Sequence, residues 1–321
     1  MTWPKRYGGG EQSGMARFVV IEELLAAGAP VAAHWIAERQ TGPSLLRFGS
    51  DEQRAKFLPP IVRGECFFAI GMSEPDSGSD LASVRTVARA TEGGWIISGS
   101  KIWTSHATRA HFMIALCRSS ERQSDRHSGL SQFIIDLSSP DVHVRPINLM
   151  SGHAHFAEVN LDSVYVGEEM LLGDEGSGWQ QVNAELAYER SGPERFLSTY
   201  PLLCALGDVL EENCDSFADA RFGSLVANLW TLHSMSESVA EQLSAGFAPQ
   251  FEAAMVKDLG TQFENDVVDV ASALSPRQLL EGSSDVFTRL LAQSVLAAPA
   301  FTLRGGTTEI LRGIIAKGLN Q

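Results

Sequence analysis

The chain has 321 residues, of which 44% are hydrophobic and 20% charged, a composition typical of soluble globular proteins with a sizeable core. This length favours two or three structural units. Lys and Arg number 25 and Asp and Glu 39, so the net charge is −14, and no segment concentrates basic residues. These features argue against nucleic-acid binding. The sequence also lacks an apolar run long enough for a membrane span and an N-terminal signal-peptide segment.

The four cysteines, Cys66, Cys117, Cys204 and Cys214, are scattered along the chain without a Cys-x-x-Cys pair. This spacing favours neither a zinc site nor a disulfide framework. We therefore expect no metal site and a cytoplasmic location.

The first part of the chain, residues 1–64, predicts a helical domain. Trp3 to Gly9 has the composition of a loop with nothing before it to anchor it, which suggests a domain shortened at its N-terminus. Apolar residues then recur at helical spacing from Met15 onward. We expect the helix at 15–27 to leave apolar surface uncovered. Ser50 opens a further short helix, and Pro59-Pro60 is expected to stop it.

Residues 65–170 change to a period of two, which predicts a β domain. A turn at Glu92-Gly93-Gly94 favours a hairpin, and Ala157, Val159 and Leu161 are expected on one face of the last strand. Short β-rich runs in this region suggest a small antiparallel barrel or sandwich, with strands expected at 66–72, 84–90, 95–98, 112–117, 131–137, 142–146 and 157–166.

Residues 171–321 return to helical spacing and predict a bundle. Helices are expected at 178–200, 216–245, 248–273, 277–295 and 307–318. The fold class is therefore α+β, with the order helical domain, β domain, helical bundle.

Several local sequences resemble one family that has this order. Met72 to Asp80 (Met-Ser-Glu-Pro-Asp-Ser-Gly-Ser-Asp) is similar to a signature of the acyl-CoA dehydrogenases, although taken alone it is a polar turn. Gly99 to Ser105 resembles the family's second flavin segment, and Gly305 to Ile310 resembles its C-terminal flavin and substrate loop. The segments lie in family order and at family spacing, so the resemblance covers nearly the whole chain.

The resemblance implies an FAD enzyme that desaturates an acyl-CoA and passes electrons to an electron-transfer flavoprotein. Ser73 would bond the flavin, Trp103 would flank it, and the Gly305 N–H would point at the thioester carbonyl. The implied cofactor contacts are Ile70, Met72, Ser73, Gly78, Ser79, Trp103, Thr104, Ser105, Arg221, Thr307 and Glu309. The implied substrate contacts are Ser79, which would meet the pantetheine, and Arg190, Gly305 and Gly306.

The reaction needs a carboxylate base at the α-carbon of the thioester. In most of the family a glutamate stands where this chain has Gly305, so the usual base is absent. A minority, including isovaleryl-type enzymes, carries a Glu-Arg pair on the helix entering the bundle, and Glu189-Arg190 occupies that position. Pro193 cannot donate to the carbonyl of Glu189, so we expect the helix to open there. The ordinary alternative is a solvated Glu-Arg pair.

Other positions depart from the family. Asp219 stands where an arginine usually holds the FAD pyrophosphate of a neighbouring subunit, and Arg221 is a possible substitute. The family's Gly-Gly-x-Gly segment is not recognisable around 279–284, a loss shared by some relatives that act on steroid or other bulky thioesters. Two alternatives follow: a non-catalytic or half-site subunit of a heteromeric assembly, and a flavoprotein oxidase or monooxygenase on the same scaffold. A homo- or hetero-oligomer, dimer or tetramer, is expected in either case.

Overall fold

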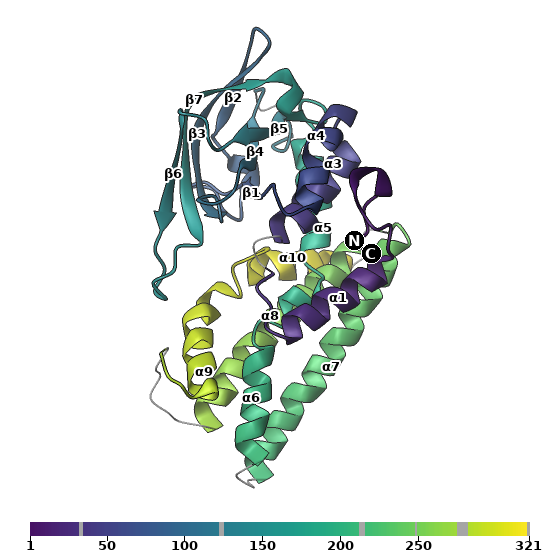
Figure 1. The fold of residues 1–321 in the computed structure, drawn as a ribbon, viewed down its shortest axis with the longest axis vertical. Coiled ribbons are helices and arrows are strands. Elements are labelled where there is room, and N and C mark those ends of the chain that lie inside the picture. The colour runs from purple at the N-terminus through teal and green to yellow at the C-terminus, as the bar shows by residue number, and fades with distance from the viewer. Residues whose placement is uncertain (32–34, 122–124, 212–215, 248, 275–281, 320–321) are drawn as a thin grey trace. The chain divides into compact units, whose positions relative to one another are not determined.

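The computed structural model describes residues 1–31, 35–121, 125–211, 216–247, 249–274 and 282–319, and Figure 1 shows its helices and strands. The chain divides into two compact units. A sheet unit comprises residues 3–11 and 32–186, and a helical unit comprises residues 1–2, 12–31 and 187–321. The division into domains 1–64, 65–170 and 171–321 stays a prediction.

The sheet unit is built on one eight-stranded sheet in the order β6-β7-β3-β2-β4-β5-β8, with β1 paired to β4. The seven predicted strands all form, and a short β8 is added. Their bounds are β1 Phe68–Gly71, β2 Val87–Thr91, β3 Gly94–Ser105, β4 Phe112–Arg118, β5 Leu130–Asp136, β6 Val142–Ile147, β7 Phe156–Gly167 and β8 Leu171–Leu172. Most pairs are antiparallel, but β1 runs parallel to β4, and β2 meets β4 in one parallel pair.

The alternation that predicted β7 corresponds to its burial, whereas β4 and β5 are buried at almost every position. Ala157, Val159 and Leu161 of β7 are all buried, as expected for one face of a half-covered strand. Glu92-Gly93 forms the two-residue connection between β2 and β3, and Gly93 has φ of 71°, which glycine adopts without strain.

Short helices of the N-terminal segment complete the core of the sheet unit. They are a 3-10 turn at Lys5–Tyr7, a π-helical turn at Ala37–Thr41, α3 at Gly42–Phe48 and α4 at Asp51–Val62. Phe57 of α4 packs edge-to-face on Phe68 of β1 and Phe112 of β4. The segment 3–9, predicted as an unanchored loop, is anchored by the buried Trp3 and Tyr7.

Helix α4 begins as expected and ends later than expected. Ser50 and Gln53 form a reciprocal capping box at its start. The helix then passes through Pro59 and Pro60 to Val62, so the predicted stop is wrong. The carbonyls that these prolines leave without intrahelical donors belong to Ala55 and Lys56, which are exposed to water.

The helical unit is a bundle with its own core. Its members are α1 at Gly14–Ala26, the end of α5 (Gly178–Glu189), a 3-10 turn at Pro193–Arg195, α6 at Tyr200–Glu211, α7 at Ser216–Ser244, α8 at Gln250–Leu274, α9 at Val286–Ala297 and α10 at Thr308–Gly318. In α1, Phe18 packs on His233 of α7, whereas Val19, Val20 and Leu24 are exposed, as predicted for apolar surface on this helix. None of the described helices is both long and apolar enough to cross a membrane.

Two predicted helix boundaries are wrong. The expected helix at 178–200 ends at Glu189, and a separate α6 starts at Tyr200. Pro193 opens the chain here, as its missing N–H predicts, but the new helix was not foreseen. The first five residues of the expected helix at 277–295 lie outside the described residues. Residues 282–285 are described and are not helical, and α9 begins at Val286, where Asp285 caps it by accepting the Thr288 N–H at 2.8 Å.

The segment between α5 and α6 lies against α8. Phe196 and Arg195 are fully buried there, and the Ser198 N–H donates to Glu264 of α8 at 3.0 Å. Gly260 of α8 makes the close approach possible, since a Cβ at this position would lie 2.5 Å from the Arg195 carbonyl oxygen. The chain that follows Glu189 is therefore fixed by packing on α8.

We predict opposite effects for two glycine-to-alanine changes within helices of this unit. Gly260→Ala should lower the free energy of unfolding by about 1–3 kcal/mol, because the methyl group overpacks the Arg195 contact. Gly223→Ala on α7, where a Cβ meets nothing within 4 Å, should raise it by about 0.5–1 kcal/mol. Urea denaturation of the full chain measures both. Equal effects of the two changes would show that the close approach does not matter.

Candidate active site

A β-bulge in β3 turns Trp103 out of the sheet unit. Lys101 pairs with Val159 and Thr104 with Ala157, so β3 contains one residue more than β7 between these pairs. Lys101 and Thr104 both point inward, whereas the Trp103 side chain is 53% exposed. Its φ of 59° is unusual for a bulky residue and represents local strain. Bulges of this kind re-aim a side chain, and here the result is an exposed indole on the surface.

The polar segment 72–80 lies beside this strand. The Ile102 N–H donates to the Ser73 carbonyl at 2.9 Å, and Lys101 Nζ donates to the Met72 carbonyl at 3.2 Å. Glu74 and Ser77 exchange backbone hydrogen bonds of 2.8 and 3.0 Å, which close the turn. The two segments that resemble flavin segments are thus joined directly.

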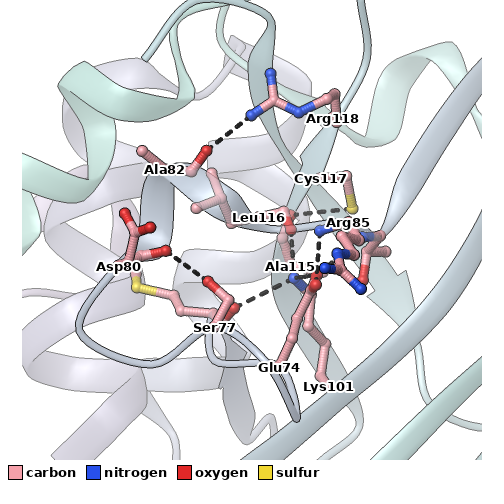
Figure 2. Close-up of polar contacts among 12 residues, drawn as sticks. Glu74, Ser77, Asp80, Ala82, Arg85, Lys101, Ala115, Leu116, Cys117 and Arg118 are labelled. Carbon is pink, nitrogen blue, oxygen red and sulfur yellow. Dashed lines mark hydrogen bonds and ion pairs between the residues drawn. The ribbon is translucent and has the colours of Figure 1, made fainter. Parts of the chain in front are cut away.

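The strongest link between them is a buried ion pair. Lys101 Nζ lies 2.8 Å from Glu74 Oε1, and both side chains are almost completely buried. The Glu74 carboxylate also accepts hydrogen bonds from the backbone N–H groups of Arg85 and Thr86, at 2.6 and 2.9 Å. Figure 2 shows Glu74 with Lys101 and Arg85. Burial alone raises the pKa of the Glu74 carboxyl, but the Lys101 ammonium and these hydrogen bonds more than offset that effect and lower it. Glu74 is therefore a carboxylate that holds three chain segments together.

Glu74 and Lys101 are the residues of this region to which the sequence analysis gave no role. Both stand inside the quoted motifs, Ser-Glu-Pro and Gly-Ser-Lys-Ile-Trp. The sequence contained one signal for this pair. Lys101 is a charged residue in a strand whose neighbouring residues alternate into the core, and a buried charge requires a partner of opposite charge.

The predicted contacts of the sheet unit differ in their exposure. Gly78 and Ser79 are exposed, and the remainder are half-buried: Ile70, Met72, Ser73 and Ser105. Thr104 differs, because its side chain is fully buried and its hydroxyl has no hydrogen-bond partner within the described parts of the chain. Thr104 as a whole is buried, so the structure does not place this predicted contact at the surface.

Two histidines border the Trp103 segment. His106 has φ of 57°, and its N–H donates to the His155 carbonyl at 2.7 Å, which ties the end of β3 to the residues preceding β7. The two imidazoles lie 6.1 Å apart. Burial lowers the pKa of both rings; the neighbouring His155 and Arg109 lower that of His106 further, and His153 that of His155.

A second cluster lies in the helical unit. Arg190 is buried, and its Nε donates to the Gly305 carbonyl at 3.1 Å. Gly305 and Gly306 have φ of 73° and 107°, which favour glycine. The Gly305 N–H has no acceptor among the residues that the structure describes. Glu189, the predicted base, is the last residue of α5, and its side chain lies outside the described residues.

The other predicted contacts of this unit lie on α10 and α7. Thr307 is the N-cap residue of α10, as expected, although its side chain does not cap the helix. Glu309 is exposed in the first turn, where its own backbone N–H and the Thr307 hydroxyl lower its pKa. Arg221 is exposed on α7, near enough to Asp266 of α8 to oppose the rise in the pKa of that carboxyl, which burial and Asp269 cause. Arg221 therefore lies beside Asp266 of α8.

The residues of the sheet unit fit the flavin that the resemblance implies. An exposed indole, flanked by the backbone of a fixed polar turn and by the Ser73 and Ser105 hydroxyls, can meet an aromatic ring with hydrogen-bonding edges. No group of three His, Cys, Asp or Glu side chains in the described ranges could hold a metal ion.

Comparison with known proteins gives the same family over most of the chain. Models of the acyl-CoA dehydrogenase N-terminal, middle and C-terminal domains match residues 1–65, 69–164 and 217–320. Acyl-CoA dehydrogenase IpdE1 of Mycolicibacterium smegmatis is 30% identical over an alignment of 335 positions, gaps included, that covers 99% of this chain and 83% of the relative. Acyl-CoA dehydrogenase FadE34 of Mycobacterium tuberculosis is also 30% identical over 99% of this chain.

The chain spans only 44% of FadE34, and its match to IpdE1 of Mycobacterium tuberculosis covers 49% of that relative. Among solved structures, the Tcur3481-Tcur3483 steroid ACAD has a TM-score of 0.87 and 25% identity, over 100% of this chain and 84% of that one. The ChsE4-ChsE5 complex from Mycobacterium tuberculosis has a TM-score of 0.85 and 26% identity, over 100% and 85%. These matches confirm the predicted fold.

Removal of the buried ammonium should destabilise the sheet unit. Lys101→Met leaves Glu74 buried without its counter-ion, so the free energy of unfolding should fall by about 3–5 kcal/mol. Arg63→Met, which removes a cation from the exposed Arg63–Glu65 pair, is the matched control and should change little. Chemical denaturation of the full chain measures both variants. A loss in Lys101→Met no larger than in the control would contradict the role given to the pair.

The histidine pair predicts a pH dependence of stability. Because the folded-state pKa of both rings lies below the ordinary value of 6.5, protonation favours the unfolded chain. Their contribution to stability is complete above pH 6.5 and declines as the pH falls below it. His106→Asn, which tolerates a positive φ, should flatten that decline, whereas His143→Asn on β6 should not. Melting temperatures between pH 7.5 and about 5 measure the slopes, and parallel slopes for all three proteins would refute the assignment.

Proposed function

Because the chain belongs to the acyl-CoA dehydrogenase family, we propose that it is an FAD-dependent enzyme that desaturates an acyl-CoA thioester between its α- and β-carbons. An electron-transfer flavoprotein is the proposed acceptor of the electrons. Cytoplasmic location remains a prediction.

The hydrogen bond from Arg190 to Gly305 is the observation that carries the proposal. It joins the residue directly after Glu189 to the glycine loop that precedes α10. Ser236 of α7 donates to the Ser191 carbonyl, so the chain on this side of Glu189 is held at two successive residues. This arrangement supports Glu189 as a base near the loop whose N–H would meet the thioester oxygen.

Each of the proposed catalytic and flavin-binding groups has one role in the reaction. The Glu189 carboxylate takes the proton from the α-carbon. The Gly305 N–H donates to the thioester carbonyl and stabilises the negative charge that develops there. Bound FAD supplies the acceptor for the hydride of the β-carbon. Trp103 covers one side of the flavin site against water, while Ser73 and Ser105 hydrogen-bond its polar edge.

The proposal also includes the kind of acyl group that the enzyme accepts and its oligomeric assembly. Two similar structures are described as a steroid ACAD and as a ChsE4-ChsE5 complex, each containing two different chains. These relatives support a bulky acyl chain, such as a steroid side chain, and a fatty acyl chain is the alternative. They also support a hetero-oligomer, and a homodimer or tetramer is the alternative.

A second candidate is a half-site or non-catalytic subunit that shapes a heteromeric assembly. Asp219, an acidic residue in the first turn of α7 at the usual position of a flavin-binding arginine, favours it. Flavin content per chain separates the candidates when this chain is purified alone and with a family partner. Flavin bound only in the mixed assembly, with activity unaffected by changes at Glu189, would support the second candidate.

Replacement of the proposed base tests the enzyme directly. Glu189→Gln keeps size and hydrogen bonding but removes the proton acceptor, so the rate of desaturation should fall by at least about 10²-fold. Flavin content should stay the same, because the carboxylate is proposed to face the substrate. Glu211→Gln, which removes an exposed carboxylate at the end of α6, is the control.

Moving the carboxylate to the position that it has in most of the family tests the base assignment more stringently than its removal alone. Gly305→Glu in the Glu189→Gln background puts a carboxylate where most of the family has it. A side chain at φ of 73° costs roughly 1–2 kcal/mol, so only part of the activity should return. Near-full activity in Glu189→Gln alone would refute the base assignment.

A further inference from the structure

Ser236 is a polar residue on the buried stripe of α7. The other buried residues of this stripe are apolar and belong to the core of the helical unit: Ala218, Leu225, Leu232 and Val239. Ser236 is completely buried among them. A hydroxyl in such a position lowers stability unless it makes a hydrogen bond. The Ser236 hydroxyl makes one, because it donates to the Ser191 carbonyl at 2.5 Å.

Other hydroxyl groups of α7 form hydrogen bonds within the helix itself. Each donates to the carbonyl four residues earlier, and each belongs to an exposed residue: Ser224, Thr231, Ser234 and Ser244. Bonds of this kind are common for a serine or threonine inside a helix. Ser236 differs, since its hydroxyl bonds to a residue 45 positions earlier in the sequence. The Ser236 hydroxyl therefore acts on the segment between α5 and α6 rather than on α7.

The Ser191 carbonyl takes this donor because of its place in the chain break. Helix α5 ends at Glu189, and the 3-10 turn that follows has its first acceptor at Gly192, where the carbonyl accepts an N–H at 3.0 Å. The Ser191 carbonyl thus lies between the two elements. Ser191 is also buried, and a buried carbonyl after a helix end requires a donor from elsewhere. The Ser236 hydroxyl supplies it.

We propose that Ser236 is a positioning residue for Glu189. The inference rests on the proposed function, in which Glu189 takes the α-proton of the acyl-CoA. The Ser236 hydroxyl fixes the carbonyl two residues after the base, and Arg190 ties the residue directly after the base to Gly305. A proton acceptor that is the last residue of a helix has no following helical turn to hold it, so its position depends on such external bonds. Ser236 is fully buried and acts through the backbone alone.

The proton transfer can be measured without the transfer of a hydride. The acyl group of 3,3-dimethylbutanoyl-CoA has hydrogens on its α-carbon and none on its β-carbon, so this thioester cannot be desaturated. In the proposed mechanism the Glu189 carboxylate takes an α-proton, and the electron pair of the broken C–H bond forms an enolate whose oxygen accepts the Gly305 N–H. In D₂O the carboxyl proton exchanges with solvent, and a deuteron returns to the carbon. Mass spectrometry of the recovered thioester gives the rate of exchange.

The test compares variants of the full flavin-loaded chain by this exchange and by desaturation of an ordinary acyl-CoA. Ser236→Ala should slow the exchange about 5- to 20-fold, less than the loss of the base itself, and lower kcat, whereas KM and flavin content stay the same. Ser236→Cys, which keeps the size of the side chain but donates weakly, should give an intermediate rate. Ser234→Ala is the matched control, because it removes an exposed hydroxyl from the same helix, and it should change neither rate.

A merely structural role of Ser236 would lower the free energy of unfolding and leave the exchange rate of the folded chain unchanged, so urea denaturation of each variant accompanies the rates. An unchanged exchange rate in folded Ser236→Ala, or an equal loss in Ser234→Ala, would overturn the inference and leave Glu189 as the base. Should Ser236→Ala not fold, an unchanged rate in Ser236→Cys would overturn it in the same way. Equal exchange in the unaltered chain and in Glu189→Gln would instead refute the base assignment, and the inference with it.

Discussion

The buried ion pair between Glu74 and Lys101 is the interaction on which the sheet unit depends. One carboxylate joins a strand residue, the polar turn at 72–80 and the residues that lead into β2. Because both charges are removed from water, neither can be left unpaired without a large cost. The pair therefore fixes the turn against β3 at the place where the bulge exposes Trp103. The same carboxylate also fixes the backbone of Arg85 and Thr86, which leads into β2.

The helical unit contains a break between α5 and α6, and tertiary contacts keep the residues of this break in place. Pro193 opens the chain after α5, and the residues after Glu189 are fixed by side chains and backbone of other helices in addition to the 3-10 turn at Pro193–Arg195. Gly260 allows them to approach α8, Glu264 binds the Ser198 N–H, and Arg190 binds the Gly305 loop. A proposed base that follows a broken helix needs such external supports, because a proton acceptor must keep its position through the reaction.

Strong periodic patterns and turn chemistry made much of this fold predictable. The strands of the sheet unit, the Glu92-Gly93 turn and the capping box at Ser50 follow from local rules, and the order of motifs indicated the family. The features of the fold that local rules could not predict depend on tertiary contacts. Pro59 and Pro60 stay helical in a helix whose affected residues, Ala55 and Lys56, are exposed, and α6 restarts after the break at Pro193. The bulge that exposes Trp103 and the partner of Lys101 arise from residues distant in sequence. The Glu189 side chain and the FAD contacts remain predictions.

The most direct test of the central claim is an anaerobic titration of the purified flavin-loaded chain with an acyl-CoA, alone or with a partner subunit of the proposed hetero-oligomer. Desaturation moves a hydride from the substrate to the flavin, so the visible absorbance of the oxidised flavin should bleach in proportion to the acyl-CoA added. Bleaching that is absent in the presence of a bound flavin and a range of fatty and steroid acyl-CoA thioesters would contradict the account.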